Sequence, residues 1–146
     1  MNGIGNFKKY KKIALDTSIF VYQIGKISPY YPITFEIFKN VEEGQQCITT
    51  TITVTEFLVK PDKLKEEDLI RKHEDMLKYY PNLRIFPVEW DLTRLASKIR
   101  AKYNFKTPDA IQLALAVSEK ADVFITNDRN MKAFKEVKVL ALSDFV

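Results

Sequence analysis

The sequence predicts an α/β fold in which helices cover both faces of a parallel sheet. Short apolar runs alternate with longer amphipathic segments along the chain, and this alternation is typical of β-α-β units. The length of 146 residues is that of one domain with a substantial core. A content of 46% hydrophobic and 29% charged residues indicates a globular protein and excludes a disordered chain.

The first half of the chain is expected to contain two strands and three helices. Phe35, Phe38 and Val41 recur at helical spacing, and Gly44 is expected to end that helix. Pro61 is expected to stop the third helix, because proline lacks the amide hydrogen that continues the hydrogen-bond ladder. In chain order, the expected elements are a strand at 13–15, a helix at 17–26, a turn at 28–32, a helix at 35–43, a strand at 46–49 and a helix at 53–61.

The second half is expected to continue the alternation of helices and strands. Asp91 is predicted to cap one helix. In the next helix, Thr107 is predicted as the N-cap and Pro108 as the first helical residue, which places Asp109 in the opening turn. The expected elements are a helix at 64–80, a strand at 83–88, a helix at 91–104, a helix from 107, a strand at 122–126, a turn at 127–130, a helical turn at 131–134 and a strand at 137–142.

A single cysteine and the absence of long apolar runs limit the class of protein. Cys47 excludes an internal disulfide and a thiolate metal cluster, and it is expected to lie buried in a strand. Asp16 interrupts the apolar stretch behind the basic start, which leaves no signal peptide. No apolar run approaches the roughly 20 residues that span a bilayer. We therefore expect a soluble protein of the reducing cytoplasm, without a membrane segment.

The chain carries an excess of positive charge. Its net charge of +4 and its pI near 9.0 mildly favour an anionic partner such as nucleic acid. We expect a single domain over residues 1–146, of which residues 1–12 form a basic N-terminal extension. Its lysines are most simply a solvated tail, and the alternative is an arm that contacts nucleic acid; they are Lys8, Lys9, Lys11 and Lys12.

Four acidic residues recur at one edge of the predicted sheet. Asp16 and Asp128 follow strands, and Glu56 lies on the helix after the second strand. Asp109 joins them from the first turn of its helix, because ligand sites of parallel sheets lie beyond the carboxyl ends of the strands. Each acid alone has a structural explanation as a cap or turn former, or as a capping box of Thr53 and Glu56. Their recurrence at one edge predicts a shared site.

The surroundings of Asp109 indicate a metal ion. Asp109 shares the apolar stripe of Leu113 and Ala116 and is expected to point inward. The polar stripe of this helix is expected to run through Gln112 and Glu119. A buried carboxylate requires a cation, and no lysine or arginine is expected at this edge. All-oxygen acidic clusters suit Mg²⁺ or Mn²⁺, which would activate water for phosphodiester hydrolysis.

Other catalytic classes are poorly supported. His73 is the only histidine and is expected at the surface or boundary of a charged helix, so neither a Ser-His-Asp triad nor a zinc site is supported. Ser18 stands where a haloacid-dehalogenase-type phosphatase requires a second aspartate. A phospho-acceptor receiver domain requires paired acids after the first strand, where only Asp16 occurs.

Four motifs in this order, "LDTSIF", "TVTEFL", "TPDAIQLALA" and "FITNDRNM", resemble those of the PIN domain, a family of metal-dependent ribonucleases. The resemblance extends from Lys12 to the C-terminus, and in size and arrangement the chain resembles most the VapC-type toxins of prokaryotic toxin-antitoxin pairs. It implies a three-layer α/β/α sandwich with a central parallel sheet of about five strands. The implied activity is endonucleolytic hydrolysis of RNA.

The resemblance also assigns site residues. One or two Mg²⁺ or Mn²⁺ ions are the implied cofactor, and the carboxylates assigned to metal binding and catalysis are Asp16, Glu56, Asp109 and Asp128. Thr17 and Thr126 match small polar positions beside these acids, which suggests supporting or substrate-positioning roles. Asn130 stands where many relatives carry a further acid, and this departure leaves the second ion open.

The implied partners are RNA as substrate, an antitoxin protein and a second copy of the chain in a homodimer. Lys102, Lys106 and Arg129 flank two of the motifs and are candidates for phosphate contacts at the rim of the site. The alternative function is a non-catalytic PIN-like module that binds RNA or a protein without cutting. The presence of all four acids argues against that alternative.

Overall fold

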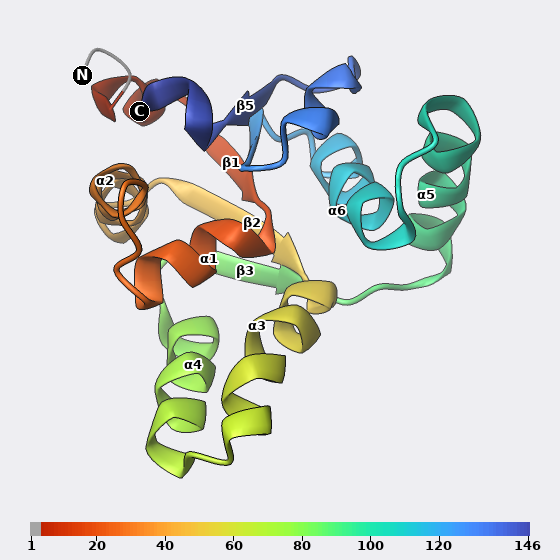
Figure 1. The fold of residues 1–146 in the computed structure, drawn as a ribbon. Coiled ribbons are helices and arrows are strands. Elements are labelled where there is room, and N and C mark those ends of the chain that lie inside the picture. The colour runs from red at the N-terminus through yellow and green to blue at the C-terminus, as the bar shows by residue number, and fades with distance from the viewer. Residues whose placement is uncertain (1–3) are drawn as a thin grey trace.

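Five parallel strands form the centre of the computed structural model, which describes residues 4–146 of the chain (Figure 1). The strands lie in the order β3-β2-β1-β4-β5, and every neighbouring pair is parallel. The predicted parallel sheet is therefore confirmed. The strands are β1 (Lys12–Leu15), β2 (Gln46–Thr50), β3 (Leu83–Phe86), β4 (Val123–Thr126) and β5 (Val139–Ala141).

Helices lie on both faces of the sheet (Figure 1). The α-helices are α1 (Thr17–Ile24), α2 (Tyr31–Glu42), α3 (Thr51–Leu64), α4 (Glu67–Tyr79), α5 (Trp90–Tyr103) and α6 (Thr107–Ser118). Short 3-10 helices are η1 (Ile4–Lys9), η2 (Arg129–Ala133) and η3 (Leu142–Phe145). Within residues 4–146, none of these helices combines the length and the apolar character that a membrane span requires.

Two hydrophobic cores flank the sheet, because successive strand residues point to opposite faces. On one face, Ile13 and Leu15 of β1 pack with buried residues of α1 and α2, and Cys47 of β2 belongs to the same core, buried as predicted. On the other face, Ala14 of β1 and Phe124 of β4 pack with buried residues of α5 and α6. This arrangement confirms the predicted three-layer α/β/α sandwich.

The strands run into their following helices with short connections at one edge of the sheet. β1 ends one residue before α1, and β2 leads directly into α3. β4 is separated from η2 by Asn127 and Asp128 only. Because these connections are so short, the polar residues within them are held close to the strand ends. Ligand sites of parallel sheets lie at this edge.

Helix α3 differs from its predicted bounds at both ends. Thr50 is the N-cap, and its hydroxyl accepts a hydrogen bond of 3.2 Å from the Ile52 amide. The predicted capping box of Thr53 and Glu56 is therefore wrong, and Thr53 lies buried within the helix. The helix also continues past Pro61, because a proline in the last turn removes a single hydrogen bond and burial of the ring offsets part of that loss.

Two further helix starts lie upstream of the predicted ones. The N-cap of α5 is Glu89, and Asp91 lies in the first turn. The N-cap of α6 is Lys106, whose ammonium group has no acceptor atom for the helix amides, and Thr107 is already helical. Asp109 lies in the first turn of α6, as predicted. The position of this acid near the positive end of the helix dipole is therefore confirmed.

The basic N-terminal segment packs on the fold from Phe7 onward. Phe7 is 1% exposed, and its ring lies 5.2 Å from the ring of Phe145. The Gln45 amide donates hydrogen bonds of 2.6 and 2.8 Å to the carbonyl oxygens of Phe7 and Tyr10. Lys12 already belongs to β1. Residues 7–12 thus belong to the packed part of the fold, and residues 1–3 of the predicted extension lie outside the described residues.

Candidate active site

Asp16 lies at the junction of β1 and α1, where it caps the helix. Its Oδ1 atom accepts a hydrogen bond of 2.7 Å from the Thr17 amide. Its Oδ2 atom accepts a hydrogen bond of 2.6 Å from the hydroxyl of Thr126, the last residue of the neighbouring strand β4. These two donors hold the carboxylate at the carboxyl edge of the sheet, in the position that the sequence predicted.

Glu56 reaches the same edge from α3. Its Oε1 atom accepts a hydrogen bond of 2.6 Å from the Thr17 hydroxyl. Thr17 therefore contacts Asp16 through its amide and Glu56 through its side chain. Thr17 and Glu56 are 39 residues apart in the chain, and because Thr17 bridges both acids, the carboxylates of Asp16 and Glu56 are held near each other.

Asp128 lies on the other side of Asp16 and caps η2. Its Oδ1 atom accepts a hydrogen bond of 3.0 Å from the Asn130 amide. Its own amide donates a hydrogen bond of 3.0 Å to the Thr126 hydroxyl, which in turn donates to Asp16. The "TND" motif is therefore a compact turn that positions two acids through one buried threonine.

Asp109 completes the acidic edge from the first turn of α6. The side chain is half-buried, and burial together with the negative charges of Asp16, Asp128 and Glu56 raises its pKa to about 6. Lys106 opposes this shift. Burial also raises the pKa of Asp16, with repulsion from Glu56 and Asp128 in the same direction and hydrogen bonds from Thr126 and Thr17 against it. The four carboxylates therefore lie close enough to repel one another.

No protein cation neutralises this edge within the described residues. The ion pairs of residues 4–146 involve Asp68, Glu136 and Asp144, and none of the four acids of the edge. In the same part of the chain, no three acidic, histidine or cysteine side chains converge as a ready-made set of metal ligands. Asp16, Glu56 and Asp128 instead accept hydrogen bonds from amide and hydroxyl donors.

The donor set nevertheless fits a hard divalent cation. It consists of carboxylates with hydroxyls behind them, and oxygen ligands of this kind suit Mg²⁺ or Mn²⁺. Glu56 and Asp128 are exposed and Asp109 is half-buried, so their carboxylates are accessible to an ion from solvent. Burial and then the negative charges of the neighbouring acids raise the pKa of Asp109, and a cation would relieve the repulsion.

The sequence model of one protein family matches most of the chain. This family is described as the PIN domain, and the match covers residues 13–138. The chain belongs to the PIN domain family. A comparison with curated protein sequences finds no match.

Solved structures of toxin-antitoxin proteins share the fold of this PIN domain. VapBC2 of Rickettsia felis, bound to a DNA fragment from its promoter, matches with a TM-score of 0.72 and 18% identity over 89% of this chain and 98% of that chain. A toxin-antitoxin complex of Klebsiella pneumoniae matches with a TM-score of 0.64 and 20% identity over 89% of this chain and 97% of that chain. VapC20 of Mycobacterium tuberculosis, a toxin that cleaves the sarcin-ricin loop, matches with a TM-score of 0.63 and 15% identity over 86% of this chain and 98% of that chain. These TM-scores show that the chain shares the fold of these proteins.

The structure of the PIN domain also contains polar residues that the sequence interpretation missed. Gln112 was expected on a polar stripe but is 2% exposed, so that expectation is wrong. Its amide donates a hydrogen bond of 2.8 Å to Thr53, which is 0% exposed and contacts Thr17. The available signal was the segment "AIQLALA", in which Gln112 is the only polar residue among apolar ones, a pattern that favours burial of the whole turn.

The three basic residues predicted at the rim have different surroundings. Arg129 forms an ion pair with Asp144, and Lys102 lies 3.7 Å from Glu136. Lys106 is exposed and close enough to Asp109 to oppose the rise of its pKa. Lys106 is therefore the best placed of the three to meet a phosphate group at the acidic edge.

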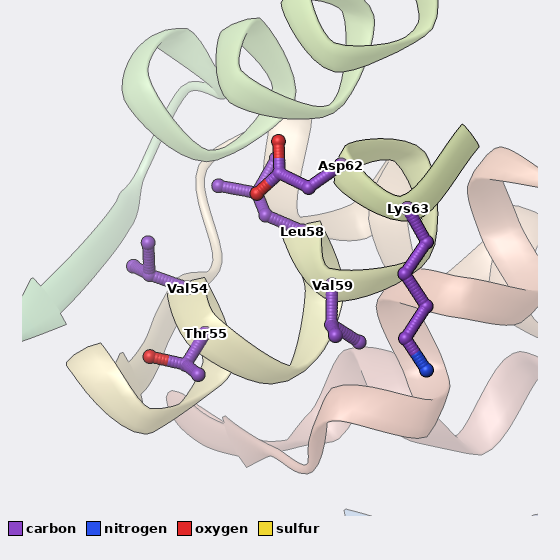
Figure 2. A pocket seen from close by; sticks show the side chains of 6 residues that line it. All are labelled: Val54, Thr55, Leu58, Val59, Asp62 and Lys63. Atoms are coloured by element: carbon purple, nitrogen blue, oxygen red, sulfur yellow. The ribbon is translucent and has the colours of Figure 1, made fainter. Parts of the chain in front are cut away.

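Two other features lie apart from the acidic edge. His73 is buried rather than at the surface, with its Nδ1 atom 2.8 Å from the carbonyl oxygen of Leu69 and its ring tilted against that of Phe57, 4.5 Å away between centroids. A shallow pocket runs along α3 (Figure 2), and it is lined by Val54, Thr55, Leu58, Val59, Asp62 and Lys63. None of the four acids lines this pocket, so we do not assign the chemistry to it.

Proposed function

We propose that this PIN domain is a metal-dependent endoribonuclease and the toxin of a toxin-antitoxin pair in the cytoplasm. One observation supports this proposal above the others. Four carboxylates from separate elements lie at the carboxyl edge of the sheet, where burial and repulsion from their neighbours raise the pKa of Asp16 and of Asp109, and none of the four forms an ion pair within the described residues. Such an arrangement costs stability and is expected where a divalent cation is bound.

In this proposal, Asp16, Glu56 and Asp109 hold Mg²⁺ or Mn²⁺, and Asp128 adds a ligand directly or through water. The bound ion supplies charge neutralisation of the phosphate and acidification of water. Asn130 offers an amide rather than a further acid, so the proposal needs one ion and leaves a second ion open.

The protein's own residues then position the reaction. Thr126 and the Thr17 amide fix Asp16, and the Thr17 hydroxyl fixes Glu56. A carboxylate of the edge accepts the proton of the attacking water, and the oxygen of the leaving ribose departs as the phosphorus-oxygen bond breaks. Lys106 contacts a phosphate of the RNA beside Asp109 and offsets the repulsion between two negative groups.

An RNA cleavage assay tests this function. The purified wild type and Asp109→Asn are incubated with a panel of structured and single-stranded RNAs in Mn²⁺, in Mg²⁺ and in excess chelator. We expect cleavage by the wild type with metal alone, and a decrease of about 100-fold or more in Asp109→Asn, because the loss of several kcal/mol of transition-state stabilisation costs tenfold for each 1.4 kcal/mol. Equal cleavage by both proteins would show contamination.

The non-catalytic alternative has one observation in its favour. The four acids do not converge as ready-made ligands within residues 4–146. A module that binds RNA without cutting would retain RNA in a gel-shift assay but give no cleavage product under any metal condition. The same cleavage panel therefore separates the two functions.

We also propose an antitoxin partner and a homodimer. VapBC2 of Rickettsia felis and the toxin-antitoxin complex of Klebsiella pneumoniae are complexes by description, and the present chain exposes large apolar side chains that a partner would cover: Phe35, Val59 and Leu64. Val59 also lines the pocket on α3 (Figure 2). Sedimentation of the isolated chain, and of the chain co-expressed with the product of a neighbouring small gene, tests both proposals.

A further inference from the structure

A buried hydrogen-bonded chain joins the three helices that carry Asp16, Glu56 and Asp109. Its members are Gln112 of α6, Thr53 of α3 and Thr17 of α1, which are 2%, 0% and 8% exposed. The Gln112 amide nitrogen donates to the Thr53 hydroxyl at 2.8 Å. The Thr53 and Thr17 hydroxyls lie 3.1 Å apart, and Thr17 donates to Glu56 at 2.6 Å.

The Thr50 hydroxyl sets the orientation of the Gln112 side-chain amide. The Thr50 hydroxyl accepts a hydrogen bond from the Ile52 amide, so its own proton is free to donate to the Gln112 carbonyl oxygen at 3.0 Å. The carbonyl oxygen of Gln112 therefore faces Thr50, and its amide nitrogen faces Thr53. An amide nitrogen can only donate, so Thr53 must accept at this contact.

This constraint directs the single proton of Thr53 away from Gln112. The proton has two hydroxyl neighbours, Thr17 at 3.1 Å and Thr49 at 2.7 Å. When Thr53 donates to Thr17, the hydroxyl of Thr17 accepts there and gives its own proton to Glu56. In that arrangement the hydrogen bonds run in one direction from Gln112 to the carboxylate. In the other, Thr53 donates to Thr49, whose own proton goes to the Leu15 carbonyl oxygen at 3.0 Å, and Thr17 stays in contact with Thr53 at 3.1 Å.

The spacing along each helix links this chain to the acids. Gln112 lies three residues after Asp109, and Thr53 lies three residues before Glu56, so each pair lies on one face of its helix. A change at Gln112 is therefore transmitted to α3 and α1 through buried contacts rather than through solvent.

We propose that Gln112 is a positioning residue, which acts through Thr53 and Thr17 to hold the Glu56 carboxylate beside Asp16 for a divalent cation. The inference rests on the proposed metal-dependent function. Gln112 does not touch the ion or the RNA in this proposal. Its role is to set the rotamer of Glu56, as outer partners do for ligands that hold metal ions.

The first test replaces Gln112 with methionine, which has a similar length but no polar atoms. We expect Gln112→Met to fold, as judged by circular dichroism, and to bind Mn²⁺ about 10-fold more weakly than the wild type in calorimetric titration. Tyr80→Phe is the matched control, because it removes a hydrogen bond of 2.9 Å to the Phe38 carbonyl far along the chain from these acids. This control is expected to keep the wild-type Mn²⁺ affinity. A folded Gln112→Met with unchanged affinity would overturn the proposal.

A pair of variants at Thr53 decides the question if Gln112→Met does not fold. Thr53→Val keeps the shape of the side chain and removes the hydroxyl, whereas Thr53→Ser keeps the hydroxyl and removes the methyl group. Both are expected to lower the melting temperature, because Thr53 is fully buried. We expect Thr53→Val to lose Mn²⁺ affinity about 10-fold and Thr53→Ser to retain it. Equal affinities in the two variants would mean that the hydroxyl has only a structural role.

Crystal structures of the metal-free proteins separate this inference from the proposed function. In the wild type, the Thr17 hydroxyl contacts Glu56, and in Gln112→Met and Thr53→Val we expect this contact to be lost. A contact that persists in both variants overturns the positioning role, whether or not metal binds. A wild type that shows the contact but binds no Mn²⁺ contradicts the proposed function instead. The role proposed for Gln112, Thr53 and Thr17 in metal binding would then be wrong as well.

Discussion

Two acidic regions of the molecule shift the pKa of an aspartate in opposite directions. Asp144, in η3, is exposed and accepts hydrogen bonds from Lys132 and Arg129, and these contacts lower its pKa. Asp109, in the first turn of α6, is half-buried and faces three other carboxylates, so its pKa rises to about 6. Asp144 therefore forms ion pairs with two protein cations, whereas Asp109 forms none within residues 4–146, and Lys106 only partly opposes the rise of its pKa.

Arg129 sharpens this contrast. It follows Asp128 directly in the sequence, yet its guanidinium group pairs with Asp144. Lys102 is likewise paired with Glu136. The chain therefore has cations near the acidic edge and directs them to other acids, which is the arrangement expected if an added cation neutralises the edge.

The largest expected difference between the two regions is the response to metal. At a Mn²⁺ concentration 100 times the Kd, the ion should stabilise the wild type by about 2.7 kcal/mol, or about 5–10 °C for a chain of this size. Asp16→Asn should lose this increase, because Asp16 lies between Glu56 and Asp128. Differential scanning calorimetry with and without Mn²⁺ measures both effects.

The control for this prediction lies in the other region. Asp144→Asn removes an acid of the same type from a place where protein cations already neutralise it. Its melting temperature should rise with Mn²⁺ as much as that of the wild type. If Asp144→Asn lost the response, or if Asp16→Asn kept it, the assignment of the metal to the acidic edge would be wrong.

The sequence predicted the fold well because the signals for it are local. Three of the strands, β1, β2 and β4, are short apolar runs that end in a threonine or directly before an acid. The ends of α3 were harder to predict. Thr53 and Glu56 match a capping box by spacing, but Thr50 lies at the carboxyl end of β2 and caps the helix first.

The site was predicted in part for the same reason. Asp16 and Asp109 are found from the turn and the helix start that hold them. The burial of Gln112 depends on α1 and α3 packing against α6, and a helical wheel of one segment does not contain that information. The raised pKa of Asp109 depends on burial and on three carboxylates from other elements, which act on it only once the elements are brought together.

The second difference concerns pH. The pKa of folded Asp109, about 6, lies above the ordinary value of 3.8, so the folded protein binds this proton more tightly than the unfolded chain. The resulting stabilisation is present below pH 3.8 and is lost as pH rises through 6. We therefore expect the metal-free wild type to lose stability relative to Asp109→Asn between pH 4 and pH 7, by an amount reduced by the partial exposure of the group.

Urea unfolding of both proteins in chelator across this pH range measures the effect. The quantity to compare is the difference in unfolding free energy between Asp109→Asn and the wild type at each pH. This difference should grow as pH rises, in favour of the variant. A difference that stays constant from pH 4 to pH 7 would show that Asp109 ionises as freely in the folded protein as in the unfolded chain.

The smallest effect is expected for the ion pairs of Asp144. Its lowered pKa gives the opposite sign: the stabilisation is present above the ordinary carboxyl pKa and is lost as pH falls through the lower value of the folded state. Asp144→Asn removes two exposed ion pairs, and pairs of this kind contribute about 0.2–1 kcal/mol each. The variant should therefore melt only a few degrees below the wild type at pH 7, and added salt should narrow that gap, because mobile ions screen exposed charges. A gap that is unchanged in 1 M salt would mean that Asp144 stabilises η3 through packing, and its contrast with Asp109 would then not be electrostatic.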